Sequence, residues 1–239
     1  MLGTTYALSE GYRLTEESSE TDIGGVVLNR RLDLSTSFSF DMELYTGDTG
    51  SDGAGMGLTF HNDSRGKTAL SSSLEESMGF GLTDNITPSL NIELDTTNNG
   101  FADISDNHWA VILDGDVRQS SSGNIVESTT SFGYSIEDND YYQATLAWNA
   151  TTNTLTFTFN GSQLFSTVYD IPSHVGTDYP WFVITAATGN SEDNEHSACF
   201  KSEPAYAPQN YVIETADSGY NSLREAINYV NANSGIDNV

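Results

Sequence analysis

Basic residues are scarce in this sequence. It has 8 Lys and Arg against 34 Asp and Glu among 239 residues, a net charge of −26, and its only lysines are Lys67 and Lys201. Nucleic-acid binding relies on clustered Lys and Arg that neutralise phosphates, and binding to a membrane surface relies on a basic helix face. We therefore expect no nucleic-acid partner. A chain this acidic needs bound divalent cations or a saline medium to offset its self-repulsion.

Cysteines and long apolar runs are also missing. Cys199 is the only cysteine, so no internal disulfide can form and stability must come from packing or bound metal. No run of about 18 apolar residues occurs, and we expect no membrane insertion. Residues 1–12 are too polar for the apolar region of a signal peptide. If the protein is exported, its signal lies outside this sequence.

Alternating apolar and polar residues dominate up to about residue 202. Residues 38–44 (FSFDMEL) have the pattern of a strand with one face in a core and one in water, and residues 90–94 repeat it. Turn-forming segments such as 149–153 and 188–190 separate further apolar runs. Many short strands, with no long amphipathic helix before residue 220, predict an all-β fold built as an antiparallel β-sandwich.

The pattern changes in the last part of the chain. Residues 203–210 (EPAYAPQN) are predicted to be a linker, and residues 211–215 to be a strand. Residues 222–233 have apolar residues at helical spacing, which predicts a helix with one apolar face. Ser222 and Glu225 form an S-x-x-E capping box at its start. A short strand-helix segment therefore follows the sandwich.

The stretch from residue 89 to residue 108 carries the strongest chemical signal. If its apolar residues face the core, Glu93 and Asp95 project together from the other face, where two carboxylates repel each other unless a positive charge lies between them. The following loop offers Asn99, Asp103 and Asp106, and the next strand opens with His108. Carboxylate and amide oxygens suit Ca²⁺, whereas imidazole with carboxylates suits a transition metal. The series predicts two adjacent ions that share carboxylates.

This ordered series resembles the metal-binding loop of legume-type (L-type) lectins, E-x-D-T-x-x-N followed by D and by H five residues later. The resemblance extends over roughly residues 6–202 and implies a concanavalin A-like jelly roll, as in bacterial members of the family, that binds carbohydrate non-covalently. The other segments that carry it are GGVVLNRRLDLSTSFSFDMEL (24–44), MGLTFHNDSRGKTAL (56–70), YYQATLAWNATTNTLTFTF (141–159) and WFVITAATGNSEDNEHSACF (181–200).

The resemblance also implies a role for each residue of the loop. Ca²⁺ would be bound by Asp95, Asn99, Asp103 and the backbone carbonyl of Thr97, and a second, Mn²⁺-like transition metal by Glu93, Asp95, Asp103 and His108. The Ca²⁺ role is mainly positional, since it fixes the loop so that Asn99 can present its amide to a sugar hydroxyl.

The sugar-contacting positions depart from the family pattern. Ala54 stands where the family has its sugar-binding Asp, so Asp52 takes that role only if the loop is shifted. Thr97 replaces the usual stacking aromatic residue, and SSSLEESMGFG (71–81) replaces the glycine-rich loop. The candidate sugar-binding residues are therefore Asp52, Gly79, Gly81, Asn99, Phe101 and, in the final specificity loop, Asn190.

The end of the chain carries a second resemblance. Residues 216–239 (ADSGYNSLREAINYVNANSGIDNV) are similar to the segment that opens many bacterial parallel β-helix surface modules. This implies a lectin-like domain over residues 1–202 and the truncated start of a following module over 211–239. We accordingly expect part of a larger multidomain chain that is secreted or exposed on the cell surface.

Three functions fit these observations. The first is a calcium-dependent carbohydrate-binding domain of an adhesin. The second is a metal-stabilised spacer that has lost its sugar site, which the altered sugar-contact loops favour. The third is a glycoside hydrolase of the same architecture, which would need two acids and a helper on one strand. Residues 93–98 (ELDTTN) supply no third acid, and we expect no enzyme.

Overall fold

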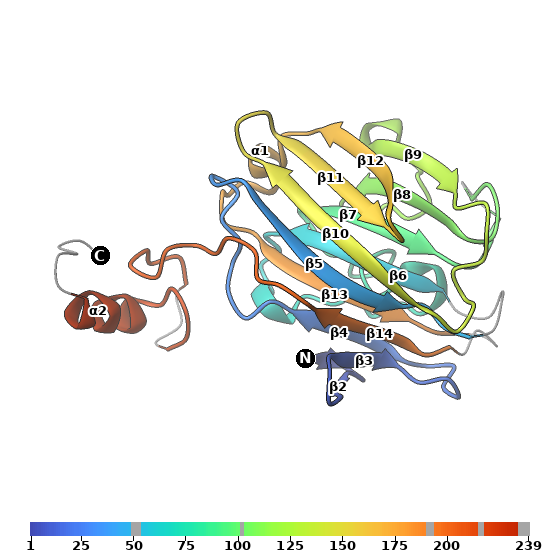
Figure 1. The fold of residues 1–239 in the computed structure, drawn as a ribbon, viewed down its shortest axis with the longest axis horizontal. Helices are drawn as coiled ribbons and strands as arrows, with labels where there is room; N and C mark the ends of the chain where they lie inside the picture. The colour runs from blue at the N-terminus through green and yellow to red at the C-terminus, as the bar shows by residue number, and fades with distance from the viewer. Residues whose placement is uncertain (49–53, 101–102, 190–193, 215–217, 234–239) are drawn as a thin grey trace.

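A computed structural model describes residues 1–48, 54–100, 103–189, 194–214 and 218–233. It is nearly all β, with two seven-stranded antiparallel sheets stacked as a sandwich (Figure 1). This confirms the predicted fold class. In spatial order, the first sheet contains β1 (Leu2–Gly3), β4 (Ile23–Val27), β13 (Trp181–Ala187), β6 (Gly55–His61), β7 (Ser89–Asp95), β8 (His108–Leu113) and β9 (Ile125–Ser131).

The second sheet packs against one face of the first. In spatial order it contains β12 (Ser162–Val168), β11 (Thr154–Phe159), β10 (Tyr141–Asn149), β5 (Phe38–Tyr45), β14 (His196–Phe200), β3 (Tyr12–Thr15) and β2 (Tyr6–Ala7). Its central strands show the predicted alternation, because Phe40, Met42 and Leu44 are buried whereas Ser39 and Asp41 are exposed.

The main core lies between the two sheets. Phe182 of β13 packs edge to face on Phe40 of β5 and on Phe60 of β6, with ring centroids 5.4 and 5.1 Å apart. Each ring of this size stabilises the fold by roughly 1.5–3 kcal/mol through burial, and the edge-to-face geometry adds to this. These contacts hold the first sheet rigidly, and that sheet carries the metal-binding candidates.

The strands β6 and β7 are buried on both faces, which the alternating pattern did not predict. The outer face of the first sheet is covered by residues 62–88, which include the 3-10 helices η1 (Gly66–Thr68) and η2 (Glu75–Ser77). Met78, Phe80 and Ile86 from this segment form a second apolar cluster with Ile112 and Val183 of the sheet. Polar residues on this face, such as Asn91, are thereby buried as well.

Helices are few and short among the described residues. The 3-10 helix η3 (Ser122–Asn124) precedes β9, and α1 (Ile171–Val175) precedes β13. The helix α2 (Leu223–Ala232) confirms the predicted C-terminal helix, with Ser222 accepting a hydrogen bond from the Glu225 backbone N–H. Within the described parts of the chain, no helix is long and apolar enough to cross a bilayer.

The segment between the sandwich and α2 lies against the body of the protein. Ala207 donates its N–H to the Arg31 carbonyl, and Arg31 pairs with Glu214. The predicted strand over 211–215 reduces, in the described residues, to one isolated bridge between Glu214 and Ser222. No neighbouring strand pairs with residues 211–213 in the described structure, so the apolar pattern alone does not make them a strand. Figure 1 shows α2 to one side of the sandwich.

Candidate metal centre

The centre is built on the adjacent strands β7 and β8. Asp95 at the end of β7 is the cross-strand partner of His108 at the start of β8. Glu93 lies two residues earlier in β7 and therefore on the same face as Asp95. On the other side of β7, Gly55 of β6 is the partner of Asp95, and a Cβ at Gly55 would lie 2.2 Å from the Leu94 carbonyl oxygen. Glycine therefore lets β6 approach the centre closely.

Four of the predicted metal ligands come together at this point. Glu93, Asp95, Asp103 and His108 each place a ligand atom within 4.8 Å of the others. The Nε2 atom of His108 lies 3.2 Å from Glu93 Oε1, 3.5 Å from Asp103 Oδ1 and 4.0 Å from Asp95 Oδ2. Glu93 and His108 are fully buried, and Asp95 is 2% exposed. Two acids and an imidazole are thus shielded from bulk water, with the partly exposed Asp103 beside them.

The backbone fixes the orientation of the imidazole. The Nδ1 atom of His108 lies 2.9 Å from the Ser105 carbonyl oxygen, and a carbonyl can only accept a hydrogen bond. Nδ1 therefore carries a proton, and the ring is held with its Nε2 edge toward the carboxylates. Metal-binding histidines are usually held in this way, with the second nitrogen donating to a carbonyl or carboxylate.

The loop after β7 folds back onto the same carboxylates. Asp95 Oδ1 accepts a hydrogen bond from the Thr97 N–H at 2.8 Å, and Asp103 Oδ2 accepts one from the Asn99 N–H at 2.7 Å. The side-chain oxygens Glu93 Oε2 and Asn99 Oδ1 are buried and have no hydrogen-bond partner among the described residues. Such buried acceptors cost free energy unless a donor or a cation satisfies them. The donor set therefore fits a cation.

Burial and charge shift the proton affinities at the centre. Burial raises the pKa of Glu93, and the bond to His108 offsets only part of this rise. For His108, burial alone would lower the pKa, but the bond to Glu93 and the charges of Glu93 and Asp103 raise it. The cluster thus tends to hold a proton, with which a bound cation would compete.

Two supporting residues were not predicted from the sequence. Asn107 has a left-handed backbone (φ 53°) immediately before His108, and its side-chain Oδ1 accepts the Ile136 N–H at 2.7 Å. Ser105 supplies the carbonyl that orients His108. Asn adopts this backbone conformation more readily than most residues, so the turn at Asn107 was weakly indicated by the sequence. A contact made by a backbone carbonyl has no sequence pattern, so the role of Ser105 could not be predicted.

The predicted sugar-binding residues are only partly described. Asp52, Phe101 and Asn190 lie outside the described residues. Gly79 and Gly81 belong to the 62–88 segment and are buried between it and its neighbours, so the structure does not bring them to the surface beside Asn99. Their Cβ positions would approach the Ala186 carbonyl at 3.2 Å and the Gly115 carbonyl at 2.9 Å, respectively.

A different part of the 71–81 loop lies beside Thr188 and Gly189, at the start of the final specificity loop. The Glu75 N–H donates to the Thr188 carbonyl at 3.0 Å, and a Cβ at Gly189 would lie 2.5 Å from Glu75 Cγ. Leu74 and Glu76 are partly exposed on either side of Glu75. Residues 74–76, rather than the two glycines, therefore lie beside Thr188 and Gly189, where the chain leaves β13.

Glu93→Gln tests whether the buried carboxylate is balanced by a cation. In EDTA we expect the variant to be more stable than the wild type by about 1 kcal/mol, because a neutral amide removes a buried charge that has no cation to compensate it. In millimolar Ca²⁺ and Mn²⁺ the order should reverse, since the wild type alone keeps all its ligands. Urea unfolding in both conditions measures the difference. The same sign of effect in both conditions would contradict the proposed ligand role.

Known proteins share both the sequence pattern and the fold. The family model described as Legume lectin domain matches residues 9–212. Peanut lectin, solved with a 9mer peptide, is 16% identical, with 86% of this chain and 91% of that chain covered and a TM-score of 0.68. Lectin II from Ulex europaeus is 14% identical, with coverages of 83% and 88% and a TM-score of 0.66. The exoplasmic/lumenal domain of VIP36, in a Ca²⁺/Man-bound form, is 14% identical, with coverages of 87% and 88% and a TM-score of 0.59.

Proposed function

Because this chain belongs to the legume lectin domain family, we propose that it is a calcium-dependent lectin domain of a bacterial adhesin, secreted or exposed on the cell surface. Members of the family bind carbohydrate and are not enzymes. The glycoside hydrolase alternative is thereby removed. The finer statements, on calcium, adhesion and location, are our proposal.

One observation carries the calcium proposal. Buried oxygen atoms converge at the end of β7, and there are too few hydrogen-bond donors to satisfy them. Glu93 Oε2 and Asn99 Oδ1 have no hydrogen-bond partner among the described residues, and His108 Nε2 faces three carboxylates. Oxygen donors suit Ca²⁺, and the imidazole with its carboxylates suits a second, Mn²⁺-like ion. A similar fold is known in a Ca²⁺/Man-bound form, which supports this assignment.

The residues of the centre would bind two ions. Asp95, Asn99, Asp103 and the Thr97 carbonyl would hold Ca²⁺, and Glu93, Asp95, Asp103 and His108 would hold the second ion. Bound cations would neutralise the carboxylates of the cluster. The short backbone bonds from Thr97 and Asn99 to those carboxylates keep the loop closed, which positions the Asn99 amide for a sugar hydroxyl.

The location is proposed from the charge of the chain. A net charge of −26 is far greater than two divalent ions can neutralise, and a saline or calcium-rich extracellular medium would screen the remainder. We also propose that residues 211–239 begin a following module. The docked segment from Ala207 to Glu214 would hold that module at the end of the sandwich opposite the metal centre.

A glycan array tests the lectin proposal. We expect glycans whose binding in millimolar Ca²⁺ is lost in EDTA and returns when Ca²⁺ is restored, because chelation removes the ions that hold Asn99 in place. Asn99→Ala should lose the same glycans. The absence of any glycan whose binding falls in EDTA would contradict the proposal.

The spacer alternative rests on a specific observation. Ala54, at the position of the family's sugar-binding Asp, is fully buried and has no polar side chain to offer a sugar. If Ca²⁺ raises the melting temperature but the array is empty, the metal centre serves rigidity alone and the spacer function is correct.

A further inference from the structure

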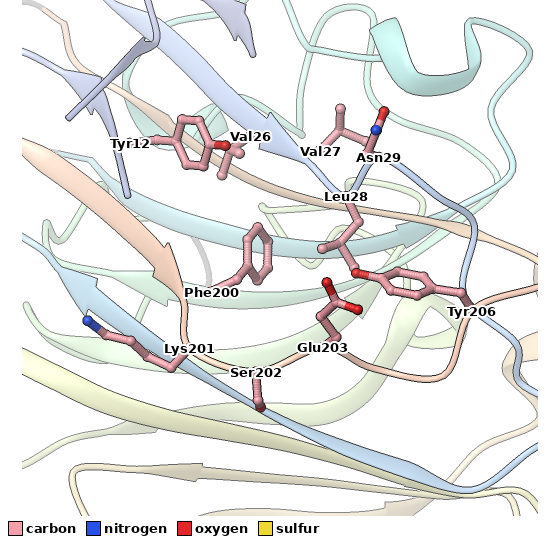
Figure 2. Close-up of a pocket in the computed structure, with 10 residues that line it drawn as sticks. All are labelled: Tyr12, Val26, Val27, Leu28, Asn29, Phe200, Lys201, Ser202, Glu203 and Tyr206. Carbon is pink, nitrogen blue, oxygen red and sulfur yellow. The ribbon is translucent and has the colours of Figure 1, made fainter. Parts of the chain in front are cut away.

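A groove opens at the far end of the sandwich from the metal centre. The metal centre lies at the end of the sandwich where β4 begins, at Ile23, and β14 begins, at His196. At this end Ile23 pairs with Ala187, the last residue of β13, and the first residue of β6 pairs with Asp95 at the end of β7. The groove lies at the opposite ends of β4 and β14, where the edges of the two sheets meet. Figure 2 shows the residues that line it, which come from β3, β4, β14 and the segment that follows β14.

Two adjoining hollows make up the groove. One has a volume of about 280 Å³ and extends to Phe200 and Tyr206. The other, of about 440 Å³, extends to Lys67 and Thr68. Four residues line both hollows, so the two are continuous: Tyr12, Val26, Val27 and Asn29. Hollows of a few hundred Å³ have the size of small-ligand pockets.

The lining combines aromatic rings with polar groups. In Figure 2 the Phe200 ring lies between Tyr12 on one side and Tyr206 on the other. Asn29 and Ser202 add an amide and a hydroxyl at the rim. Rings that offer a flat apolar surface, with a few polar groups beside them, form the lining that orients small polar ligands such as pyranoses.

Three of the eight Lys and Arg residues lie at or beside the groove. Lys67 lines one hollow and Lys201 the other, and these are the only lysines in the sequence. Arg30 lies over the Tyr206 ring, with its guanidinium carbon 4.7 Å from the ring centroid. Among the described residues, no salt bridge involves Lys67 or Arg30, whereas Lys201 pairs with Glu43 at 3.1 Å.

Acidic groups at the groove do not remove this charge. Glu203 lines the hollow beside Tyr206, and Glu43 balances Lys201. Lys67 and Arg30 remain without a carboxylate partner in the described structure. In a chain of net charge −26, this makes the groove less negative than the chain as a whole, which favours an anionic ligand here over other parts of the surface.

We propose that this groove is a second saccharide-binding site, specific for an acidic sugar such as a uronic or sialic acid residue, and independent of the metal centre. Lys67 attracts the sugar carboxylate, and Lys201 offsets the charge of Glu43, which would otherwise repel it. Tyr12 and Phe200 contact the apolar face of the pyranose ring. Asn29 and Ser202 bind its hydroxyls. Glu203, which lies beside Tyr206, accepts hydrogen bonds from hydroxyls at the end of the ligand away from the carboxylate.

Titration calorimetry of the full chain with tri-galacturonate in EDTA tests this site. We expect binding of tri-galacturonate and none of the neutral galactose trisaccharide. Lys67→Gln combined with Lys201→Gln should weaken binding by about tenfold, because it removes one partly exposed ion pair with the ligand and leaves the Glu43 charge without a partner, and added salt should weaken wild-type binding. Lys67→Arg with Lys201→Arg should keep most of the affinity. Tyr12→Ala should weaken it independently of salt.

Several outcomes would overturn the proposal: no binding of tri-galacturonate in EDTA, equal binding of the neutral trisaccharide, or undiminished binding by the double Gln variant. Lysine-dependent sedimentation with phosphatidylglycerol vesicles, without tri-galacturonate binding, would assign the groove to anionic lipid instead. Thermal melts of each variant check that it remains folded.

The test separates this site from the calcium-dependent one. Asn99→Ala in Ca²⁺ should lose EDTA-sensitive glycans on the array and keep tri-galacturonate binding. The double Gln variant should do the reverse. If tri-galacturonate binding fails while EDTA-sensitive binding persists, only the groove proposal is wrong.

Discussion

Asp103→Asn should abolish both the stabilisation by calcium and calcium-dependent glycan binding. Asp103 contacts His108 through one carboxylate oxygen and the Asn99 N–H through the other, so it links both proposed ion positions to the loop. A cation that binds only the folded state stabilises it by about 2.7 kcal/mol at a hundredfold excess over its Kd. Removing a direct ligand should also lower glycan affinity by more than the 10–100-fold typical of outer-shell changes.

Asp106→Asn provides the matched control. Asp106 is an exposed acid of the same loop that accepts the Asn98 N–H at 3.1 Å, and it has no proposed ligand role. Thermal melts in Ca²⁺ and in EDTA should differ by several degrees for the wild type and for Asp106→Asn, and should coincide for Asp103→Asn. A calcium shift that survives in Asp103→Asn would place the ion elsewhere.

Lowering the pH from about 6.5 to 4 should destabilise the fold through two buried histidines. Burial lowers the pKa of His61 to about 4, aided by Arg31 and Arg65 and opposed by Asp63. Burial also lowers the pKa of His196 to about 4. In the unfolded chain a histidine protonates near pH 6.5. Between the two values the unfolded state binds more protons, so stability falls as the pH falls, by about 1.4 kcal/mol per pH unit for each histidine.

Urea unfolding from pH 8 to 4, in EDTA to exclude metal release, measures this dependence. His196→Asn keeps a polar atom near Thr15, which lies 2.7 Å from His196 Nδ1, and His61→Asn keeps an acceptor for the Asp63 N–H. Each variant should lose overall stability but show a flatter dependence than the wild type below pH 6.5, with parallel curves above pH 7. Curves parallel throughout would show that these histidines are not the cause.

The metal centre was predictable from the sequence because its geometry is mostly local. Residues two apart on a strand share a face, which placed Glu93 beside Asp95 before any contact was known. A hairpin-like return of the chain then brought His108 opposite Asp95. The order of residue types along 93–108 therefore predicted one cluster, and the fold brings four of its members together. Their separate roles as metal ligands came from the resemblance to L-type lectins and stay a prediction.

The sugar-contact predictions were harder because they depend on loop packing. Gly79 and Gly81 were chosen as small residues that would let the backbone approach a sugar, yet both are buried. The tight turn that buries them contains left-handed residues, including Met78 and Leu82. Sequence position alone cannot show which part of such a loop faces outward, since that depends on the sheet beneath it.

The sequence by itself determined the all-β class, the domain-scale alternation, the capped C-terminal helix and the series of candidate metal ligands, since each depends on neighbours a few residues apart. Only the tertiary structure decided that the outer face of β6 and β7 is buried, that the Ser105 carbonyl orients His108, and that Lys67 and Lys201 share one groove. These features join segments far apart in the chain, and packing between such segments sets the burial and charge that each side chain meets.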